Sequence, residues 1–369
     1  MGRGIHILVV ICGLSFSLFA QQGQKAVYQF DTLAKGKSLK IIALPVVFST
    51  PETGFGFGAG AQMFLLRKTN IYNARLSNMF VSAIYTTKKQ FMFEAKPQIY
   101  LDRGGYFLDT VLKYRIFPNS FWGIGNTTPD ENEESYDMTS FELKARFLKR
   151  LPPSLNFGFE FVYENHDVTM VEEGGILDSG TVLGNNDAIV SGLGAIFNLD
   201  SRDIVEAPSS GHFLQLNARF SSEIMGATSS FNKFIFDLRT YLPVGEKNVI
   251  ALQFYSENTY GEIPFQAKSW FGGGERARGY FRGRFIDNHQ YVIQGEYRHK
   301  FHPRWTAAGF ALIGEVAELP GEFLDDIKPS VGGGIRFKLT KEQNTILRLD
   351  VGVGKDGNSG FYFGVNEAF

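Results

Sequence analysis

Apolar and polar residues alternate along most of the chain between residues 38 and 369, with a period of two residues rather than about 3.6. In the segment 291–301, for example, Tyr291, Ile293 and Tyr297 alternate with Gln294 and Glu296. Successive side chains of a β-strand point to opposite faces, so each segment has one apolar face and one polar or glycine-rich face. The pattern therefore predicts β-strands and gives no sign of a helical domain.

Sixteen such segments are present, and many are longer than an average globular strand. Long connections follow odd-numbered segments, whereas most of those after even-numbered segments are tight turns. Both features are typical of barrels that cross an outer membrane, and they favour a barrel over a soluble all-β fold. We therefore predict a 16-stranded antiparallel transmembrane β-barrel, an all-β fold of the outer-membrane type, with strands at 38–50, 53–68, 75–89, 90–102, 106–118, 134–151, 154–171, 186–201, 211–225, 229–244, 248–261, 287–302, 304–316, 327–339, 344–354 and 358–369.

The N-terminus has the features of a signal peptide, predicted at residues 1–20. Arg3 precedes an apolar run over residues 7–19, and Ala20 is a suitable cleavage point. Residues 21–37 would then form a short periplasmic segment, followed by the barrel at 38–369. Cys12 is the only cysteine, so the mature chain would have no thiol and no disulfide.

The composition limits the functional classes. A net charge of −1 gives no reason to expect nucleic acid as a partner. The 36 phenylalanines and 41 glycines fit an all-β protein with an apolar outer surface. No grouping of Ser, His and acidic residues indicates catalysis, and no histidine pair has metal-ligand spacing. We therefore predict that the protein is not an enzyme, with no catalytic residues, no metal and no cofactor.

One segment, residues 272–286, departs from the alternating pattern. It places four arginines among glycines and aromatic residues, namely Arg276, Arg278, Arg282 and Arg284. An arginine-rich loop between amphipathic strands must face water or enter a water-filled space, and a barrel lumen is such a space. Glycines at 272–274 and 279 allow the chain to reverse tightly. The alternative is an ordinary solvated basic loop.

Several stretches resemble the BamA/TamA outer-membrane insertase superfamily, also called the bacterial surface-antigen family. They are Pro51–Gly58, Asp200–Asp203, Arg278–Tyr280, Glu296–Arg298 and Gly332–Phe337. The resemblance is strongest at Arg278-Gly279-Tyr280, because eleven predicted strands precede this motif and five follow it, as in the family. The resemblance covers about residues 38–369.

The resemblance implies that the motif Arg278-Gly279-Tyr280 lies in the lumen and that Arg278 pairs with acidic residues of the wall. Inward-facing Glu296 is the best candidate, because a confined guanidinium needs a carboxylate and arginine gives an oriented contact. The family's second acid would lie in the thirteenth strand, two residues before a glycine. This chain has Leu312 at that place, so the second partner stays open.

The first and last strands would meet at a seam. Pro45 removes a hydrogen-bond donor from the first strand. Phe369 would end the last strand, which resembles the C-terminal targeting signal of bacterial outer-membrane proteins. One interpretation is a seam that parts sideways towards lipid, and the other is a tolerated irregularity at a barrel edge.

The family resemblance implies insertion or translocation of other outer-membrane proteins. The implied location is the bacterial cell outer membrane. The implied partners are its lipid, nascent outer-membrane proteins and periplasmic or outer-membrane accessory subunits. Residues 21–36 are too few for the polypeptide-transport-associated domains that BamA and TamA carry, so a partner would have to capture substrates. A passive pore and a structural subunit of a surface complex remain the alternatives.

Overall fold

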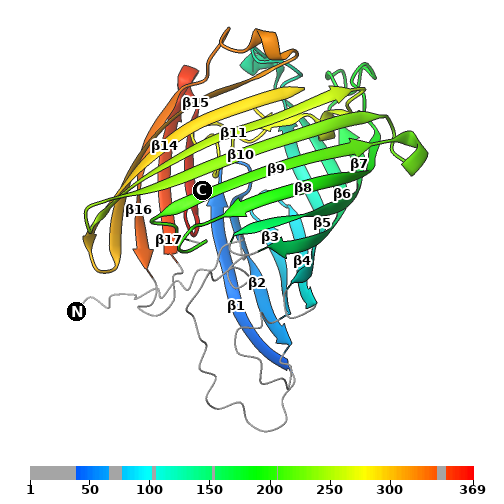
Figure 1. Ribbon diagram of the computed structural model, residues 1–369. Helices are drawn as coiled ribbons and strands as arrows, with labels where there is room; N and C mark the ends of the chain where they lie inside the picture. Colours follow the sequence, from blue (N-terminus) through cyan, green and yellow to red (C-terminus); the bar gives the residue numbers. More distant parts are fainter. Residues whose placement is uncertain (1–38, 66–76, 102–104, 152–153, 206, 339–345) are drawn as a thin grey trace, which may run out of the picture.

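The computed structural model describes residues 39–65, 77–101, 105–151, 154–205, 207–338 and 346–369. The predicted signal peptide at 1–20 and the predicted segment 21–37 lie outside the described residues. In the described part, sixteen strands close into an antiparallel barrel (Figure 1). No helix within these ranges is long and apolar enough to span a membrane.

Chain neighbours pair around the barrel, except that β11 pairs with β14 and β18 closes onto β1. The barrel strands are β1 (Leu39–Thr50), β2 (Gly54–Leu65), β3 (Asn78–Thr86), β4 (Phe91–Leu101), β5 (Tyr106–Phe121), β6 (Glu134–Leu151), β7 (Leu155–Val171), β8 (Asp187–Asp200), β9 (Gly211–Ser221), β10 (Phe231–Val244), β11 (Asn248–Gly261), β14 (His289–His302), β15 (Trp305–Ala317), β16 (Ser330–Lys338), β17 (Ile346–Gly354) and β18 (Ser359–Val365). The predicted fold class is confirmed, and each predicted strand corresponds to one strand of the wall.

Two predicted strands extend four residues beyond the observed C-terminal end. The ninth ends at Ser221 rather than 225, because Ser222 caps a short 3-10 turn over Glu223–Met225 and Gly226 reverses the chain with φ of 86°. The last ends at Val365 rather than 369. Asn366 has φ of 66°, and its N–H donates to the carbonyl of Ile346 at 2.7 Å, so the chain turns out of the sheet there.

The wall is apolar outside and polar inside. Along β7, Phe157 and Phe159 are exposed on the outer face, whereas Glu160 and Glu164 are buried on the inner face. The same inversion is found on β9, where Leu216 is exposed and Asn217 is buried. Because the outer face carries the large apolar side chains, the surface suits lipid and the lumen suits charged groups.

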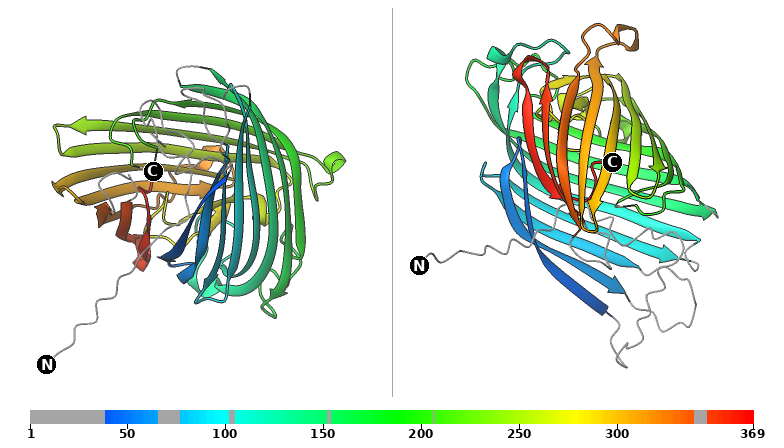
Figure 2. Two further views of the ribbon diagram at one scale, coloured as in Figure 1. Left: turned by 90° about the horizontal axis from the view of Figure 1, so that it is seen from below. Right: turned by 90° about the vertical axis from the view of Figure 1, so that its left-hand side faces the viewer.

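The strands differ greatly in length around the barrel. β5, β6 and β7 have 16, 18 and 17 residues, whereas β16, β17 and β18 have 9, 9 and 7. The short strands therefore lie on the side where β18 meets β1, seen as the red and blue ribbons in Figure 2. The barrel therefore closes with β18, its shortest strand, against β1.

Candidate functional site

The segment 262–288 between β11 and β14 forms a folded unit, called here the lumen loop. A 3-10 turn over Phe265–Ala267 leads into β12 (Ser269–Phe271), which pairs with β13 (Phe285–Asp287). At Gly272, with φ of 113°, a Cβ atom would lie 2.0 Å from the carbonyl oxygen of Phe281, so the hairpin requires glycine there. Between the two strands, the tip at 272–284 carries the predicted motif.

Arg278 is fully buried against one side of the wall, between β14 and β17. Its Nη1 atom lies 2.8 Å from Oε2 of Glu296 on β14 and 2.6 Å from Oδ2 of Asp350 on β17. The guanidinium carbon lies 3.5 Å from the ring centroid of Phe310, and Nε and Nη2 make no hydrogen bond. One nitrogen therefore makes both ion pairs, while the rest of the group stacks on an aromatic ring.

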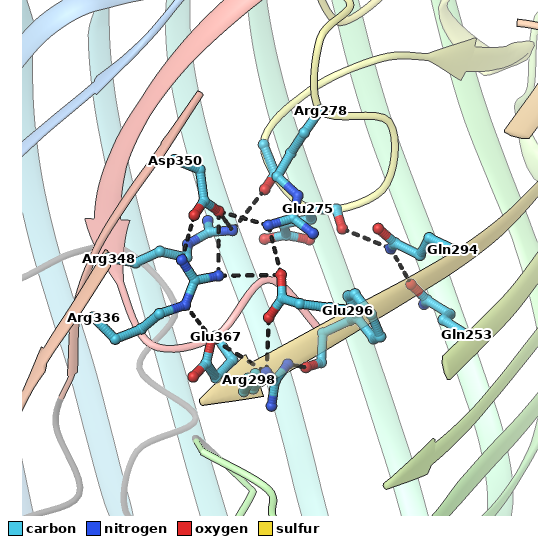
Figure 3. A network of polar contacts seen from close by, with 12 residues as sticks. Gln253, Glu275, Arg278, Gln294, Glu296, Arg298, Arg336, Arg348, Asp350 and Glu367 are labelled. Atoms are coloured by element: carbon cyan, nitrogen blue, oxygen red, sulfur yellow. Dashed lines mark hydrogen bonds and ion pairs between the residues drawn. The ribbon is translucent and has the colours of Figure 1, made fainter. Parts of the chain in front are cut away.

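Arg278 belongs to a larger group that we call the arginine–carboxylate cluster. Figure 3 shows its members, which come from the lumen loop, β14, β16, β17 and the C-terminal tail: Arg278, Glu296, Arg298, Arg336, Arg348, Asp350 and Glu367. Arg336 contacts Asp350, lies 3.1 Å from Glu296 and 2.9 Å from Glu367, and so joins the three acids. Arg348 lies 3.3 Å from Asp350 and donates to the carbonyl of Gly274 at 2.9 Å.

The cluster satisfies charges that burial would otherwise make unfavourable. Glu296 and Asp350 have no exposed side-chain surface, and Arg336 retains 1%. A buried charge that loses its partner typically costs about 3–5 kcal/mol, because it can neither reach water nor find another counter-charge. The cluster therefore binds the loop tip to β14, β16 and β17 as one unit.

The two residues after Arg278 complete the attachment of the tip. Gly279 has φ of 108°, and its N–H donates to the Tyr362 hydroxyl at 3.0 Å. The Tyr280 hydroxyl donates to the carbonyl of Pro329 at 2.7 Å and accepts from the N–H of Lys355 at 2.8 Å. Because the Tyr280 ring is fully buried, the tip is held by packing as well as by charge.

Glycines of the wall make room for this tip. A Cβ atom at Gly352 would lie 2.8 Å from the backbone nitrogen of Gly279, and one at Gly354 would lie 2.5 Å from the Tyr280 ring. Both glycines are on β17, on the same inward face as Asp350. β17 thus supplies the carboxylate and, directly above it, the space that the loop occupies.

The second acidic partner of Arg278, Asp350, was not predicted. The family pattern pointed to the thirteenth strand, where Leu312 packs in an apolar cluster instead. Nearby Glu315 is buried, but it accepts from the Tyr291 hydroxyl at 2.9 Å and the Asp326 N–H at 3.2 Å, so it holds a different loop. The alternation of residues 345–353 already placed Asp350 on the inward face. It gave no information about the position of Asp350 along the barrel axis relative to Arg278.

The seam between β1 and β18 is narrow. Their register contains the single pair Ser49 and Phe363, whereas β1 and β2 pair at twelve positions. Pro45 is exposed on β1, opposite Ala59 of β2, four residues from the point where β18 is joined. The strand edge around Pro45 therefore has no partner strand on the β18 side within the described residues.

The structure corrects the predicted place of Phe369. It does not lie on β18 at the seam but inside the barrel, buried against Tyr241 and Ala251. Its backbone oxygen accepts a hydrogen bond from Nη2 of Arg298 at 3.0 Å. The sequence pattern suggested one unbroken strand, but the turn at Asn366 and the pairing of Glu367 with Arg336 direct the last residues inward.

No group of three His, Cys, Asp or Glu residues in the described ranges could hold a metal ion. The described contacts hold the charged loop tip against β14 and β17, on the side of the barrel where β18 meets β1.

Comparison with known proteins agrees with this architecture. A model of the Omp85 superfamily domain matches residues 57–369. BamA from Haemophilus ducreyi lacking POTRA domains 1–3 is similar, with a TM-score of 0.63 and 12% identity over 89% of this chain and 70% of that one. CdiB from Acinetobacter baumannii has a TM-score of 0.56 and 12% identity over 90% of this chain and 60% of its own. CdiB from Escherichia coli has a TM-score of 0.58 and 10% identity over 89% of this chain and 62% of its own.

At these identities the structural likeness shows the fold alone. No curated protein matches the chain. The superfamily model, however, matches most of the sequence and includes fifteen of the sixteen wall strands in full or in part. The protein therefore belongs to the Omp85 superfamily and is a barrel of the bacterial outer membrane.

Proposed function

We propose that this barrel inserts or translocates other outer-membrane proteins through the seam between β1 and β18. The observation that carries the proposal is the single paired position, Ser49 with Phe363, where the wall closes. A sheet edge with few ladder hydrogen bonds separates at little cost and offers free backbone groups to an incoming strand. An arriving client strand could pair with the edge of β1 around Pro45.

The short strands beside the seam also favour this side of the barrel as the place where client proteins would enter the membrane. The seven residues of β18 span about 23 Å at about 3.3 Å per residue, before tilt shortens their reach. A bilayer core is about 30 Å thick, so the lipid beside β16–β18 would have to thin. A thinned bilayer lowers the barrier for a new strand that enters from the seam.

In this proposal the lumen loop braces the wall beside the seam. Arg278 joins β14 to β17, and Arg336 on β16 joins the same acids to Glu367 in the C-terminal tail. The motif Arg278-Gly279-Tyr280 and Glu296 would act as a lock that keeps the wall in one register while the seam parts. Capture of clients would fall to accessory subunits, and nascent outer-membrane proteins would be the clients.

The test is a reversible crosslink across the seam. Ser49 and Phe363 are replaced by cysteine in the mature chain, where the predicted removal of Cys12 leaves no other thiol. The protein is reconstituted in liposomes, and the folding of an added unfolded outer-membrane barrel is followed by its shift in electrophoretic mobility. We expect the reduced protein to accelerate folding of the added barrel. Oxidation should abolish this acceleration, and a reductant should restore it.

The matched control is Ala43→Cys with Ala61→Cys, which joins β1 to β2 and leaves the seam free. Oxidation of this pair should leave the acceleration unchanged. Full activity of the oxidised seam crosslink would remove the seam from the mechanism. If the wild-type protein folded clients no faster than empty liposomes but gave a steady conductance, the passive pore would be the better function.

A further inference from the structure

The four arginines of the lumen loop tip have different surroundings. Arg278 pairs with Glu296 and Asp350, and Arg284 pairs with Asp130 and donates to Thr128. Among the described residues, no carboxylate lies within ion-pair distance of Arg276 or Arg282. Two cationic side chains of the tip therefore have no ion pair with the wall within the described residues.

Both of these arginines line one cavity in the lumen, with a volume of about 730 Å³. Ten basic and six acidic side chains line this cavity, so its wall carries an excess of positive charge. The wall opposite the loop is largely neutralised: Lys144 lies 2.8 Å from Glu164, and Lys233 lies 2.6 Å from Glu257. At the loop tip, Arg276 and Arg282 line the cavity together with one carboxylate, Glu275, so the tip contributes a net positive charge.

Some of the arginine donors at this cavity are held in place without a hydrogen-bond partner. The guanidinium carbon of Arg276 lies 3.8 Å from the ring centroid of Tyr255, a stacked position that leaves the edge of the group free for an acceptor. The Nε atoms of Arg276, Arg115 and Arg348 are buried without a hydrogen-bond partner. Buried donors normally have a partner, and these three all line the same cavity.

We propose that the cavity binds a small molecule that carries phosphate or carboxylate groups, with Arg276 and Arg282 as its principal contacts. Guanidinium groups bind such oxyanions through paired, charge-assisted hydrogen bonds. The cavity has the size of ordinary small-ligand sites, about 300–1,000 Å³. The backbone N–H of Arg282 donates to Glu52 at 2.6 Å, which fixes this part of the tip without using its guanidinium.

The first test is calorimetric titration of the folded barrel in detergent at low ionic strength, with tripolyphosphate as the phosphate probe and citrate as the carboxylate probe. We expect saturable binding of at least one probe, and a dissociation constant at least tenfold higher in the double variant Arg276→Gln/Arg282→Gln. Lys247→Gln removes one positive charge from an exposed turn outside the cavity and should bind as the wild type does. The probe that binds more tightly identifies the preferred oxyanion.

A second measurement needs no variant. Phenylglyoxal modifies accessible guanidinium groups, and mass spectrometry of the digested protein measures each site. Saturating probe should slow modification of Arg276 and Arg282 at least fivefold and leave Arg304, in an exposed turn outside the cavity, unaffected. Absence of saturable binding, or equal modification with and without probe, would overturn the proposal. Neither experiment involves a client protein, so its result is independent of the proposed insertase function.

Discussion

The Oδ2 atom of Asp350 accepts a hydrogen bond of 2.6 Å from Nη1 of Arg278, a residue 72 positions earlier in the chain. This contact joins the loop tip to β17, the strand next to the one that closes the barrel. Arg336 and Arg348 share the same carboxylate. The attachment of the lumen loop therefore depends strongly on one acidic side chain.

Asp350→Ala should release the loop tip. Three buried guanidinium groups would lose a counter-charge, and breaking a buried pair typically costs about 3–5 kcal/mol. We expect chymotrypsin to cleave after Tyr280 or Phe281 at least tenfold faster than in the wild type, as measured by mass spectrometry. Asp325→Ala, in an exposed loop, is the control. Unchanged cleavage would show that Asp350 does not hold the tip.

Arg278→Lys should retain more of the attachment than Arg278→Ala. Only Nη1 of Arg278 pairs with Glu296 and Asp350, so a single ammonium group can replace part of that interaction. The stacking on Phe310 would be lost. Chymotrypsin should therefore cleave the wild type most slowly, the Arg278→Lys variant faster and the Arg278→Ala variant fastest. Equal sensitivity of the lysine and alanine variants would show that the guanidinium plane, rather than the charge, holds the loop.

Gly352→Ala should displace the tip without any change of charge. The new Cβ atom would lie 2.8 Å from the nitrogen of Gly279 and 2.9 Å from the carbonyl carbon of Arg278, both of which are backbone atoms. Protease sensitivity of the tip should therefore rise several-fold. Gly309→Ala is the control, because a Cβ atom there meets nothing within 4 Å. If both variants behaved as the wild type, the tip would not occupy the position described.

Glu367→Gln should free the C-terminal tail. The Glu367 carboxylate lies 2.9 Å from Nε of Arg336, and Ala368 behind it is 7% exposed. A cysteine placed at Ala368 should react slowly with a membrane-impermeant maleimide, and at least tenfold faster when Glu367 is also changed to glutamine. Glu246→Gln, in an exposed turn, should leave the rate unchanged. Fast labelling in the parent protein would mean that the tail is not held inside.

The loop over residues 318–329 should loosen in acid. Burial opposes ionisation of Asp326, but hydrogen bonds from Lys328 and Lys355 outweigh it and hold the pKa of this carboxyl below its usual value. The carboxylate therefore stabilises the loop above the ordinary aspartate pKa of about 3.8, and this contribution is lost as pH falls through the lowered pKa. Pepsin cleavage near Phe323 should rise over that interval, relative to a peptide standard.

In Asp326→Asn the same cleavage should be high at every acidic pH, while Asp325→Asn should follow the wild type. A wild-type cleavage rate that stays flat below pH 3.8 would contradict the role of Asp326.

Much of the wall was predictable because the alternation of apolar and polar residues depends only on the strand itself. A strand in a barrel must alternate lipid-facing and lumen-facing residues, and this alternation, as at Phe157 and Glu160, is visible in the sequence without knowledge of any neighbour. The ends of strands were less predictable. Phe369 has the right residue type for the last strand, but the turn at Asn366 and the ion pair of Glu367 with Arg336 direct it inward.

The sequence by itself determined the number of strands, the alternation of lipid-facing and lumen-facing residues along them and the identity of the loop that carries the arginines. Only the tertiary structure decided that Asp350 rather than a residue of the thirteenth strand meets Arg278, and that β1 and β18 pair at one position. The reason is that strand register and barrel shear set the height of each residue along the wall. A period of two shows which way a side chain points, but it carries no information about the residue that this side chain meets inside the lumen.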